Sequence, residues 1–394
     1  MRMIPRTGLV LAVAALLTAF SSSTPTPTTS GAPASTGVPG VPTLRTSTVV
    51  DGLENAWDLG FLPGGAMLVT ERPGRVQLVR DGTKTRVAMN LDDVFAQGES
   101  GLMGLLVHPD FATTRQFSTC QSHTVGGRPV DVRVVTWTLS ADGTSASGPT
   151  ALVTGLPVNP SGRHSGCRIG LDPHGALMIS TGDTANPDAP QDLQNLGGKT
   201  LRANLTTGDP LPDAPFPTSP YVWSYGHRNL QGIVVRPGTD QVFTAEHGPD
   251  VDDEVNLEQR GTNYGWDPSQ GGTVTTYDES VPMTDTKRFP DAVTAVWSSG
   301  DPTEAVSGAA FLTGPQWGVL DGALVVAALK GQKVLAITLD AAGARTGVVV
   351  PPKLDGTLGR LRSVHQGQDG ALYLTTDNGS SGSGDAVVRV QPQG

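Results

Sequence analysis

One hairpin-like unit recurs six times along the chain, and this repetition is the strongest constraint on the fold. Each copy has a short apolar run, a turn rich in proline, aspartate and glycine, and a second apolar run that leads into a polar loop. Six small sheets of this kind predict an all-β fold, a six-bladed β-propeller, whereas the alternative, a β-sandwich, would not need six similar hairpins. The six copies span residues 57–71, 104–121, 167–183, 231–246, 307–327 and 361–377.

The composition agrees with a fold built of strands and turns. The 394 residues include 50 glycines and 31 prolines, and only 16% of them are charged. The net charge of −10 argues against a nucleic-acid partner, because a phosphate backbone requires a basic face, and it favours hard-cation sites built from oxygen ligands. The copies are unevenly spaced, and residues 184–197 and 267–296 are the clearest insertions. Long loops on a compact scaffold shape a binding site or remain disordered.

The N-terminus has the layout of a secretory signal peptide. Arg2 and Arg6 precede an apolar run over residues 8–20, which is too short to cross a bilayer. The predicted location is therefore secreted, or extracytoplasmic, with no stable insertion into a membrane. We expect three segments: a signal peptide at 1–23, a Ser/Thr/Pro-rich linker at 24–44 and the propeller at 45–392.

The two cysteines predict a disulfide bond. An even number of cysteines in an exported chain favours pairing, and two buried free thiols are the alternative. Cys120 closes the second strand of one unit, and Cys167 opens the first strand of the next. Neighbouring blades of a propeller lie side by side, so these strands can approach within bonding distance. The bond would tie the second unit to the loop that carries His164.

The stretch from Tyr225 to Asp267 carries the most specific motifs of the chain. It contains GHRN-x-QG, then E-x-GP-x-x-DDE-x-N, and finally NYGW. A cationic loop and an oxygen-rich loop flank one hairpin here, and strand packing requires neither of them. The pattern resembles the soluble quinoprotein sugar dehydrogenases, the glucose/sorbosone dehydrogenase family that uses pyrroloquinoline quinone (PQQ). The resemblance covers about residues 45–392, and it too implies a six-bladed β-propeller.

The resemblance implies an enzyme that oxidises aldose sugars to lactones, with hydride transfer to PQQ and a histidine as general base. The matching histidine is His164, which begins an H-x-x-x-R motif that ends at Arg168. A neutral imidazole suits this role because its pKa ordinarily lies near the working pH. The family often has an acidic residue directly before this histidine, whereas this chain has Arg163. Without that carboxylate we expect a less well oriented base and a lower rate.

The resemblance also assigns the contacts to the cofactor. Arg228 and Asn229 match the pair beside the reactive quinone carbonyls, where Arg228 would stabilise the negative charge that develops as hydride arrives. Glu99 lies where relatives carry Gln or Glu, and the resemblance implies that it makes a polar contact with cofactor or sugar. Arginine pairs with carboxylates through two parallel hydrogen bonds, which suits a tricarboxylate ligand. The basic residues that match carboxylate contacts are Lys330, Arg360 and Arg362.

Two calcium sites follow from the same resemblance. The carbonyl oxygens of Gly248 and Pro249 match ligands of a Ca²⁺ ion that also binds the quinone and acts on it as a Lewis acid. Asp253, Glu254 and the Tyr264 carbonyl resemble the ligands of a second, structural Ca²⁺ ion.

The implied partners are a small-molecule sugar substrate and an external electron acceptor, such as a quinone, a dye or a cytochrome. Two alternatives to a sugar dehydrogenase remain open from the sequence alone. One is a propeller that binds carbohydrate or protein without catalysis, since fold alone does not decide function. The other is a calcium-dependent lactonase of similar shape, which would line its channel with carboxylates in place of the arginine and lysine set.

Overall fold

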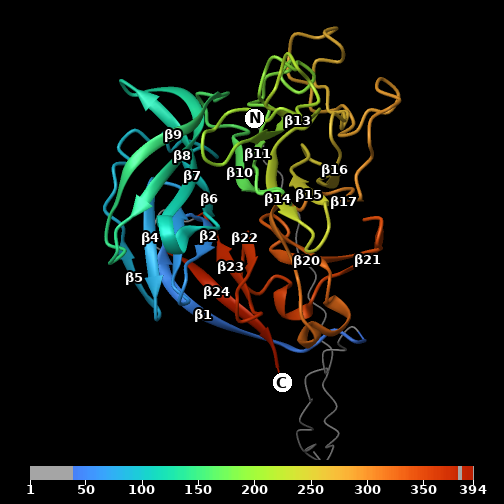
Figure 1. The fold of residues 1–394 in the computed structure, drawn as a ribbon. Helices are drawn as coiled ribbons and strands as arrows, with labels where there is room; N and C mark the ends of the chain where they lie inside the picture. Colours follow the sequence, from blue (N-terminus) through green and yellow to red (C-terminus); the bar gives the residue numbers. More distant parts are fainter. Residues whose placement is uncertain (1–38, 380–383, 394) are drawn as a thin grey trace, which may run out of the picture. The chain divides into compact units, whose positions relative to one another are not determined.

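The computed structural model describes residues 39–379 and 384–393, which form six four-stranded antiparallel sheets arranged as the blades of a propeller (Figure 1). Each of the six repeated sequence units supplies the first two strands of one sheet. The predicted all-β, six-bladed β-propeller is therefore confirmed. The predicted signal peptide at 1–23 and most of the linker at 24–44 lie outside the described residues.

In the first five blades the strand order follows the order of the chain, from the inner strand outward. The first and second blades contain β2 (Ala56–Phe61), β3 (Met67–Glu71), β4 (Arg75–Arg80) and β5 (Thr83–Arg86), then β6 (Leu102–Val107), β7 (Gln116–Val125), β8 (Arg128–Leu139) and β9 (Ala146–Leu156). The third and fourth contain β10 (Gly166–Leu171), β11 (Leu177–Thr181), β12 (Lys199–Ala203) and β13 (Val222–Tyr225), then β14 (Leu230–Val235), β15 (Val242–Glu246), β16 (Glu254–Glu258) and β17 (Trp297–Ser298). The fifth contains β18 (Val306–Phe311), β19 (Leu324–Ala328), β20 (Lys333–Leu339) and β21 (Arg345–Val349).

The sixth blade joins the two ends of the described chain. Its inner strands are β22 (Leu361–Gln366), β23 (Leu372–Thr376) and β24 (Asp385–Pro392), and its outermost strand is β1 (Leu44–Leu53). β1 lies antiparallel to β24, as the blue and red strands of Figure 1 show. Backbone hydrogen bonds between distant parts of the chain thus close the ring.

Helices are few and short in the described part of the chain. They are α1 (Phe111–Thr114) and the 3₁₀ helices η1 (Pro315–Leu320) and η2 (Pro352–Leu354). None of these is long or apolar enough to pass through a bilayer.

The repeated turn has a local chemical cause, which the third blade illustrates. The side chain of Asp172 accepts hydrogen bonds from the backbone amides of His174 and Ala176, both at 2.8 Å. Gly175 completes the turn with a φ of +83°, which a residue without a Cβ adopts at little cost. The turn brings β11 back antiparallel to β10, so the start of β10 and the end of β11 lie at the same end of the hairpin.

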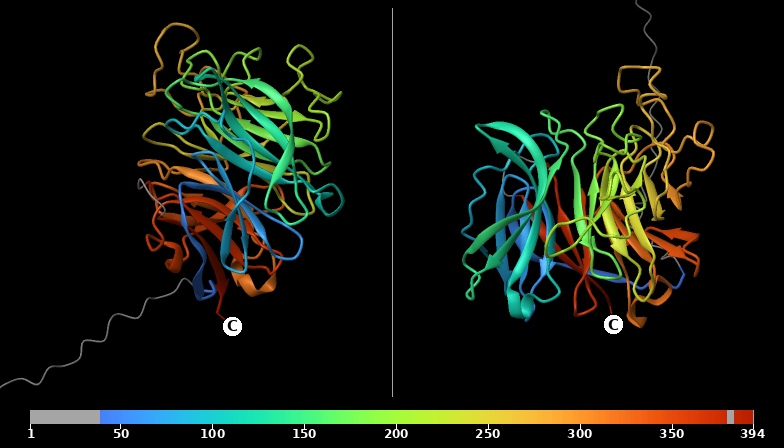
Figure 2. Two further views of the ribbon diagram at one scale, coloured as in Figure 1. Left: turned by 90° about the vertical axis from the view of Figure 1, so that its left-hand side faces the viewer. Right: turned by 45° about the horizontal axis from the view of Figure 1, so that its top comes forward.

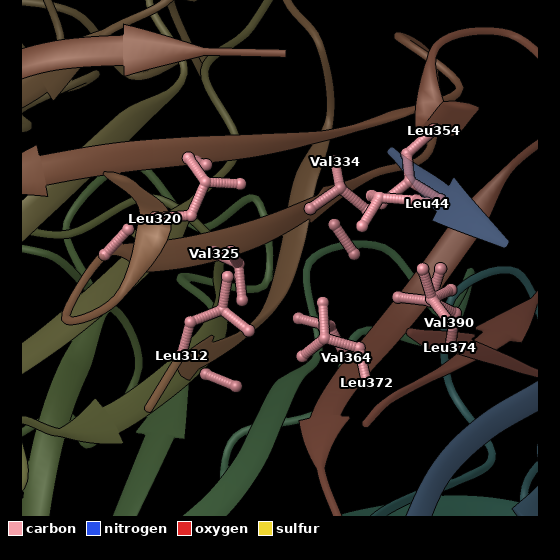
Figure 3. Close-up of a cluster of buried hydrophobic side chains, with 14 of the residues drawn as sticks. Leu44, Leu312, Leu320, Val325, Val334, Leu354, Val364, Leu372, Leu374 and Val390 are labelled. Carbon is pink, nitrogen blue, oxygen red and sulfur yellow. The ribbon is translucent and has the colours of Figure 1, made fainter. Parts of the chain in front are cut away.

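Apolar side chains fill the space between neighbouring blades. Each inner strand contacts the inner strand of the next blade, and the series β2, β6, β10, β14, β18 and β22 returns to β2. Figure 3 shows the interface of the fifth and sixth blades, where Val325 and Val334 pack in one cluster with Val364 and Leu374. This packing fixes each sheet by its two faces, and it holds the loops at the ends of the inner strands in place.

A disulfide bond links Cys120 on β7 to Cys167 on β10, with a Cα–Cα distance of 5.7 Å. The predicted bond is therefore present, and it joins the second blade to the third. Both cysteines are fully buried. Since Cys167 lies three residues after His164, the bond also anchors the segment that carries the predicted base.

Replacing both cysteines by alanine should lower the free energy of unfolding by up to about 4 kcal/mol, because the bond closes a loop between residues 47 apart in sequence. Denaturant titration of the oxidised protein and of the double variant measures this difference. Equal unfolding midpoints for the two proteins would show that the bond does not stabilise the fold.

Candidate active site

A cavity of about 530 Å³ opens where loops from several blades meet, and its volume is typical of small-molecule sites. Most of its residues lie near the starts of inner strands or the ends of the strands that follow them, and in antiparallel hairpins these positions share one end. Of the twelve predicted site residues, the cavity brings together ten and leaves out Glu254 and Tyr264. The ten are Glu99, His164, Arg228, Asn229, Gly248, Pro249, Asp253, Lys330, Arg360 and Arg362.

His164 is buried, and it is held by a carboxylate from the neighbouring strand. Its Nδ1 lies 2.7 Å from Oδ1 of Asp183. A carboxylate accepts a hydrogen bond, so we assign the proton of the neutral ring to Nδ1 and leave Nε2 as the acceptor. Nε2 in turn accepts a hydrogen bond from Nε of Arg163 at 3.3 Å. The imidazole is therefore oriented with its unprotonated nitrogen toward the side of the site occupied by Arg163.

Asp183 is the functional residue that the sequence interpretation missed. Its carboxylate accepts hydrogen bonds from the Ala185 amide, from Nε1 of Trp266 and from the Tyr277 hydroxyl, at 2.8, 2.8 and 2.6 Å. These donors fix it against the imidazole. The absence of an acidic residue at position 163 therefore does not leave the base without a carboxylate partner, contrary to our expectation.

The sequence gives a partial signal for Asp183, because the predicted hairpin brings the start of β10 and the end of β11 to the same end. A register shift between Gly166 and Ile169 pairs Gly166 of β10 with Thr181 of β11. Continuing this shifted register by two residues places His164 opposite Asp183. The carboxylate stands 19 residues after the histidine in sequence, but directly across the hairpin from it.

Arg228 and Asn229 directly precede β14 and are both buried. Nη1 of Arg228 donates to the His247 carbonyl at 3.1 Å, and its Nη2 is paired with Glu279. The buried Nε of Arg228 has no hydrogen-bond partner among the described residues. Asn229 donates from Nδ2 to Oε2 of Glu99 at 2.9 Å, so these two predicted cofactor contacts are linked.

Glu279 is a further cavity residue that the sequence interpretation did not identify. It belongs to the long insertion between β16 and β17, drawn in yellow to orange in Figure 2. One of its oxygens pairs with Arg228, and the other lies 2.7 Å from Nη2 of Arg163. Partial burial opposes its ionisation, but the two guanidinium groups outweigh burial and lower the pKa of Glu279. The carboxylate is thus ionised and bridges two arginines.

The three predicted carboxylate-binding cations differ in how firmly they are held. Arg362 donates to Oδ2 of the buried Asp377 through Nε and Nη2, at 3.1 and 2.7 Å. Burial raises the pKa of Asp377, but Arg362 and its other partners outweigh burial and lower it. Arg360 donates to the Asp377 carbonyl at 2.8 Å. Lys330 is exposed, and its Nζ donates to the Thr303 hydroxyl at 2.8 Å.

The predicted calcium ligands fall into two groups. Gly248 and Pro249 line the cavity. Asp253 also lines it, but its carboxylate accepts hydrogen bonds from the amides of Gly248 and Glu304, at 2.8 and 2.6 Å. Burial raises the pKa of this carboxyl.

The remaining two predicted ligands lie away from the cavity. Glu254 accepts from Asn256 and Thr284, and the Tyr264 hydroxyl donates to the Leu257 carbonyl. Within residues 39–379 and 384–393, no three His, Cys, Asp or Glu side chains are grouped so as to hold a metal ion. The second calcium site of Asp253, Glu254 and the Tyr264 carbonyl stays a prediction.

A buried group of charges supports the cavity from within the propeller. Nη1 of Arg168 lies 2.6 Å from Oδ1 of Asp58, and its guanidinium stacks 4.1 Å from the ring centre of Trp57. His365 lies 2.7 Å from the same carboxylate oxygen. Burial raises the pKa of Asp58, but Arg168 and His365 outweigh burial and lower it. Arg168 also donates to the carbonyl of Gln231, a cavity residue, so this arginine of the H-x-x-x-R motif serves as support beneath the site.

Comparison with known proteins agrees with this site. A model of the family described as Glucose / Sorbosone dehydrogenase matches residues 53–385. The aldose sugar dehydrogenase YliI of Escherichia coli K12 is 30% identical over 362 residues, which cover 89% of this chain and 94% of that protein.

Solved structures of similar proteins have the same fold. A putative oxidoreductase (glucose dehydrogenase) of Thermus thermophilus is 36% identical with a TM-score of 0.74, covering 88% of this chain and 100% of that one. The PQQ-bound aldose sugar dehydrogenase of Streptomyces coelicolor is 29% identical with a TM-score of 0.72, covering 90% of this chain and 100% of that one.

The fold and the site thus define a propeller-type sugar oxidoreductase. The chain belongs to the glucose/sorbosone dehydrogenase family, the PQQ-dependent soluble sugar dehydrogenases.

Asp183→Asn should lower turnover by about 100-fold or more, because an amide in place of the carboxylate no longer fixes the base with Nε2 free or stabilises its protonated form. Steady-state dye reduction at saturating PQQ measures the effect. Asp188→Asn is the matched control, since Asp188 is an exposed residue of the same loop. Similar turnover in the two variants would remove Asp183 from the reaction.

Proposed function

We propose that this member of the PQQ-dependent sugar dehydrogenases oxidises aldose sugars at the anomeric carbon to lactones, with His164 as the general base. The observation that supports this most is the His164–Asp183 pair opening onto the same cavity as four cations, Arg228, Lys330, Arg360 and Arg362. A base without these cations would fit many hydrolases. The combination of the two fits a site for an anionic redox cofactor.

The chemistry of the donor set fits PQQ, a planar tricarboxylate ortho-quinone. Lys330, Arg360 and Arg362 would hold its carboxylates, and the buried, unpartnered Nε of Arg228 lies on a guanidinium that faces the cavity. Asn229, linked to Glu99, would complete the polar contacts. When bound, PQQ supplies the acceptor for the hydride that leaves the anomeric carbon.

The residues of the chain supply the proton transfer and the electrostatics. Nε2 of His164 takes the proton of the anomeric hydroxyl, and Asp183 stabilises the imidazolium that results. Arg228 places positive charge where negative charge develops on the acceptor. Five arginine and lysine residues line the cavity beside the four carboxylates of Glu99, Asp250, Asp253 and Glu279. This mixed lining argues against the lactonase alternative, which calls for a channel lined mainly by carboxylates.

We propose Ca²⁺ as a second cofactor, held by the carbonyl oxygens of Gly248 and Pro249. Both residues line the cavity, and Ca²⁺ readily accepts carbonyl ligands. The electrons would then leave to an external acceptor, and the N-terminal sequence supports secretion as the setting of the reaction.

Titration of metal-stripped protein with PQQ and Ca²⁺, followed by dye reduction across a panel of sugars, tests the proposal. We expect a PQQ spectrum that develops with bound cofactor and requires Ca²⁺, and aldose-dependent reduction of the dye. PQQ binding that is equally tight in chelator would refute the calcium proposal. Protein that neither binds PQQ nor reduces the dye with any sugar would refute the enzyme.

His164→Ala should bind PQQ as the natural protein does, yet lose roughly two to four orders of magnitude in turnover, the usual contribution of a general base. Single-turnover reduction of bound PQQ by sugar isolates this step from reoxidation by the dye. A variant that keeps most of its rate would exclude His164 as the base.

Lys330→Met should weaken PQQ binding about tenfold or more through loss of a charge-assisted hydrogen bond, and should leave the melting temperature unchanged because Lys330 is exposed. Arg362→Ala should weaken binding and also lower the melting temperature, because it leaves buried Asp377 without its guanidinium partner. Lys353→Met, at another exposed lysine, is the control. Equal PQQ affinity in Lys330→Met and the control would place Lys330 outside the cofactor site.

A further inference from the structure

Arg163 occupies the place that a substrate hydroxyl must reach. Its Nε lies 3.3 Å from Nε2 of His164, the ring nitrogen opposite the one bound to Asp183. A hydroxyl that gives its proton to Nε2 must come within hydrogen-bond distance of that atom. The substrate therefore meets Arg163 as it meets the base, and takes over the hydrogen bond that Arg163 makes.

Glu279 lies between the proposed base and the proposed cofactor side of the cavity. Its carboxylate bridges Arg163, beside the base, and Arg228, on the proposed cofactor side. In the proposed reaction the anomeric hydroxyl gives its proton to His164 and the anomeric carbon gives a hydride toward the cofactor, so this carbon must lie between these two sides. The Glu279 carboxylate therefore lies beside the reacting end of the sugar.

The Arg163–Glu279 pair is partly solvent-exposed, whereas the catalytic groups are buried. The side chains of Arg163 and Glu279 are 42% and 37% exposed, against 6% for Arg228 and 4% for His164. The guanidinium of Arg163 also lies 5.4 Å over the ring of Tyr277, which belongs to the same inserted loop as Glu279. The inserted loop therefore holds the pair in place. Either side chain is exposed enough to exchange its contact with the other for a contact with a ligand.

The charges of the side chains that line the cavity also favour a role for this pair in binding the substrate. Five arginine and lysine residues are found among the described residues that line it, and four of them are accounted for by the proposed cofactor. The fifth, Arg163, shares the Glu279 carboxylate with Arg228, and the lining also contains Glu99, Asp250 and Asp253. Together the side chains of Arg163 and Glu279 offer donors and acceptors for hydroxyl groups and present no net charge to the substrate.

We propose that Arg163 and Glu279 form the sugar-binding pair of this site, which holds the hydroxyl on the carbon next to the anomeric carbon and selects neutral aldoses over sugar acids. This inference rests on the proposed function. A vicinal hydroxyl donates to the Glu279 carboxylate and accepts from the Arg163 guanidinium, so both groups stay paired. A uronate would bring a further carboxylate into a cavity already lined by Glu99, Asp250, Asp253 and Glu279, whose cations are assigned to the cofactor or paired with Glu279.

The test compares Arg163→Gln and Glu279→Gln with the unaltered protein, each loaded with saturating PQQ. With D-glucose as the probe, each variant should lose about tenfold or more in kcat/KM, because a polar group is left without its partner. The PQQ affinity of Arg163→Gln should stay within about threefold, which separates a sugar contact from a cofactor contact. The charge-keeping variants Arg163→Lys and Glu279→Asp should lose less than the glutamine variants.

The matched control is Arg389→Gln, which removes a guanidinium from an ion pair of similar exposure, Arg389 with Asp369, that does not line this cavity. Its kcat/KM should remain unchanged. A loss in Arg163→Gln no larger than in this control would overturn the proposal.

A deoxy sugar provides a readout that a purely structural role would not change. With 2-deoxy-D-glucose, which lacks the hydroxyl assigned to the pair, the ratio of kcat/KM between unaltered protein and each variant should fall from about tenfold or more toward one. An equal ratio for glucose and 2-deoxyglucose would refute the assignment of this hydroxyl to the pair.

D-glucuronate tests the charge preference. The unaltered protein should use it at least about tenfold less well than glucose, and Glu279→Gln should reduce this preference by removing the like charge. Equal use of the two sugars by the unaltered protein would refute selection for neutral aldoses. Failure of the unaltered protein to oxidise any sugar would instead refute the proposed function, so the two failures are distinguishable.

Discussion

The active-site cavity depends on one set of backbone hydrogen bonds, the pairing of β1 with β24 that closes the ring. Glu99, His164, Arg228, Lys330 and Arg362 come from five different blades, the second to the sixth. Each inner strand contacts the next, so no two blades alone define the cavity. With β1 detached, the sixth sheet would have an open edge, and the ring would lose the backbone hydrogen bonds that join the two ends of the described chain. The side chains at the axis would then no longer be held at fixed distances.

The sequence predicted the features that rest on local patterns. Six hairpins with the same turn chemistry indicate six sheets, and motifs at the ends of those hairpins indicate which loops carry chemistry. The disulfide also follows from local position, since β7 and β10 belong to neighbouring blades. Cys167 lies at the start of β10, but Cys120 lies in the middle of β7 and not at the end of a strand, as we had predicted it would. The closing strand β1 could not be found in this way. It does not belong to a repeated unit, and its partner β24 is more than 330 residues away in sequence.

Within the site, too, local sequence patterns indicate some residues, whereas others are brought in only by the folded chain. Asp183 lay only partly within reach of sequence reasoning. The predicted hairpin indicates that the carboxylate lies near His164, but the register shift between Gly166 and Ile169 places the two opposite each other. Glu279 lay out of reach, since it belongs to an inserted loop without repeats or regular strands, and only the folded course of that loop brings it to Arg163 and Arg228. Predicting neither carboxylate led us to expect a poorly oriented base behind Arg163. The structure instead assigns the two tasks to different carboxylates, one that orients the imidazole and one that pairs with the arginine.

The loop of residues 267–296 joins functions that the propeller itself keeps apart. Tyr277 donates to Asp183, Glu279 bridges Arg163 and Arg228, and Thr284 donates to Glu254. The blades fix the proposed base and the cations by strand pairing and core packing, whereas residues 267–296, all of them described, form no strand. Changes in the loop can therefore alter what lies beside the base while the fold is left intact. Under the proposed sugar-binding role of Arg163 and Glu279, the scaffold supplies the redox chemistry of the family, and a residue outside the blades contributes to substrate preference.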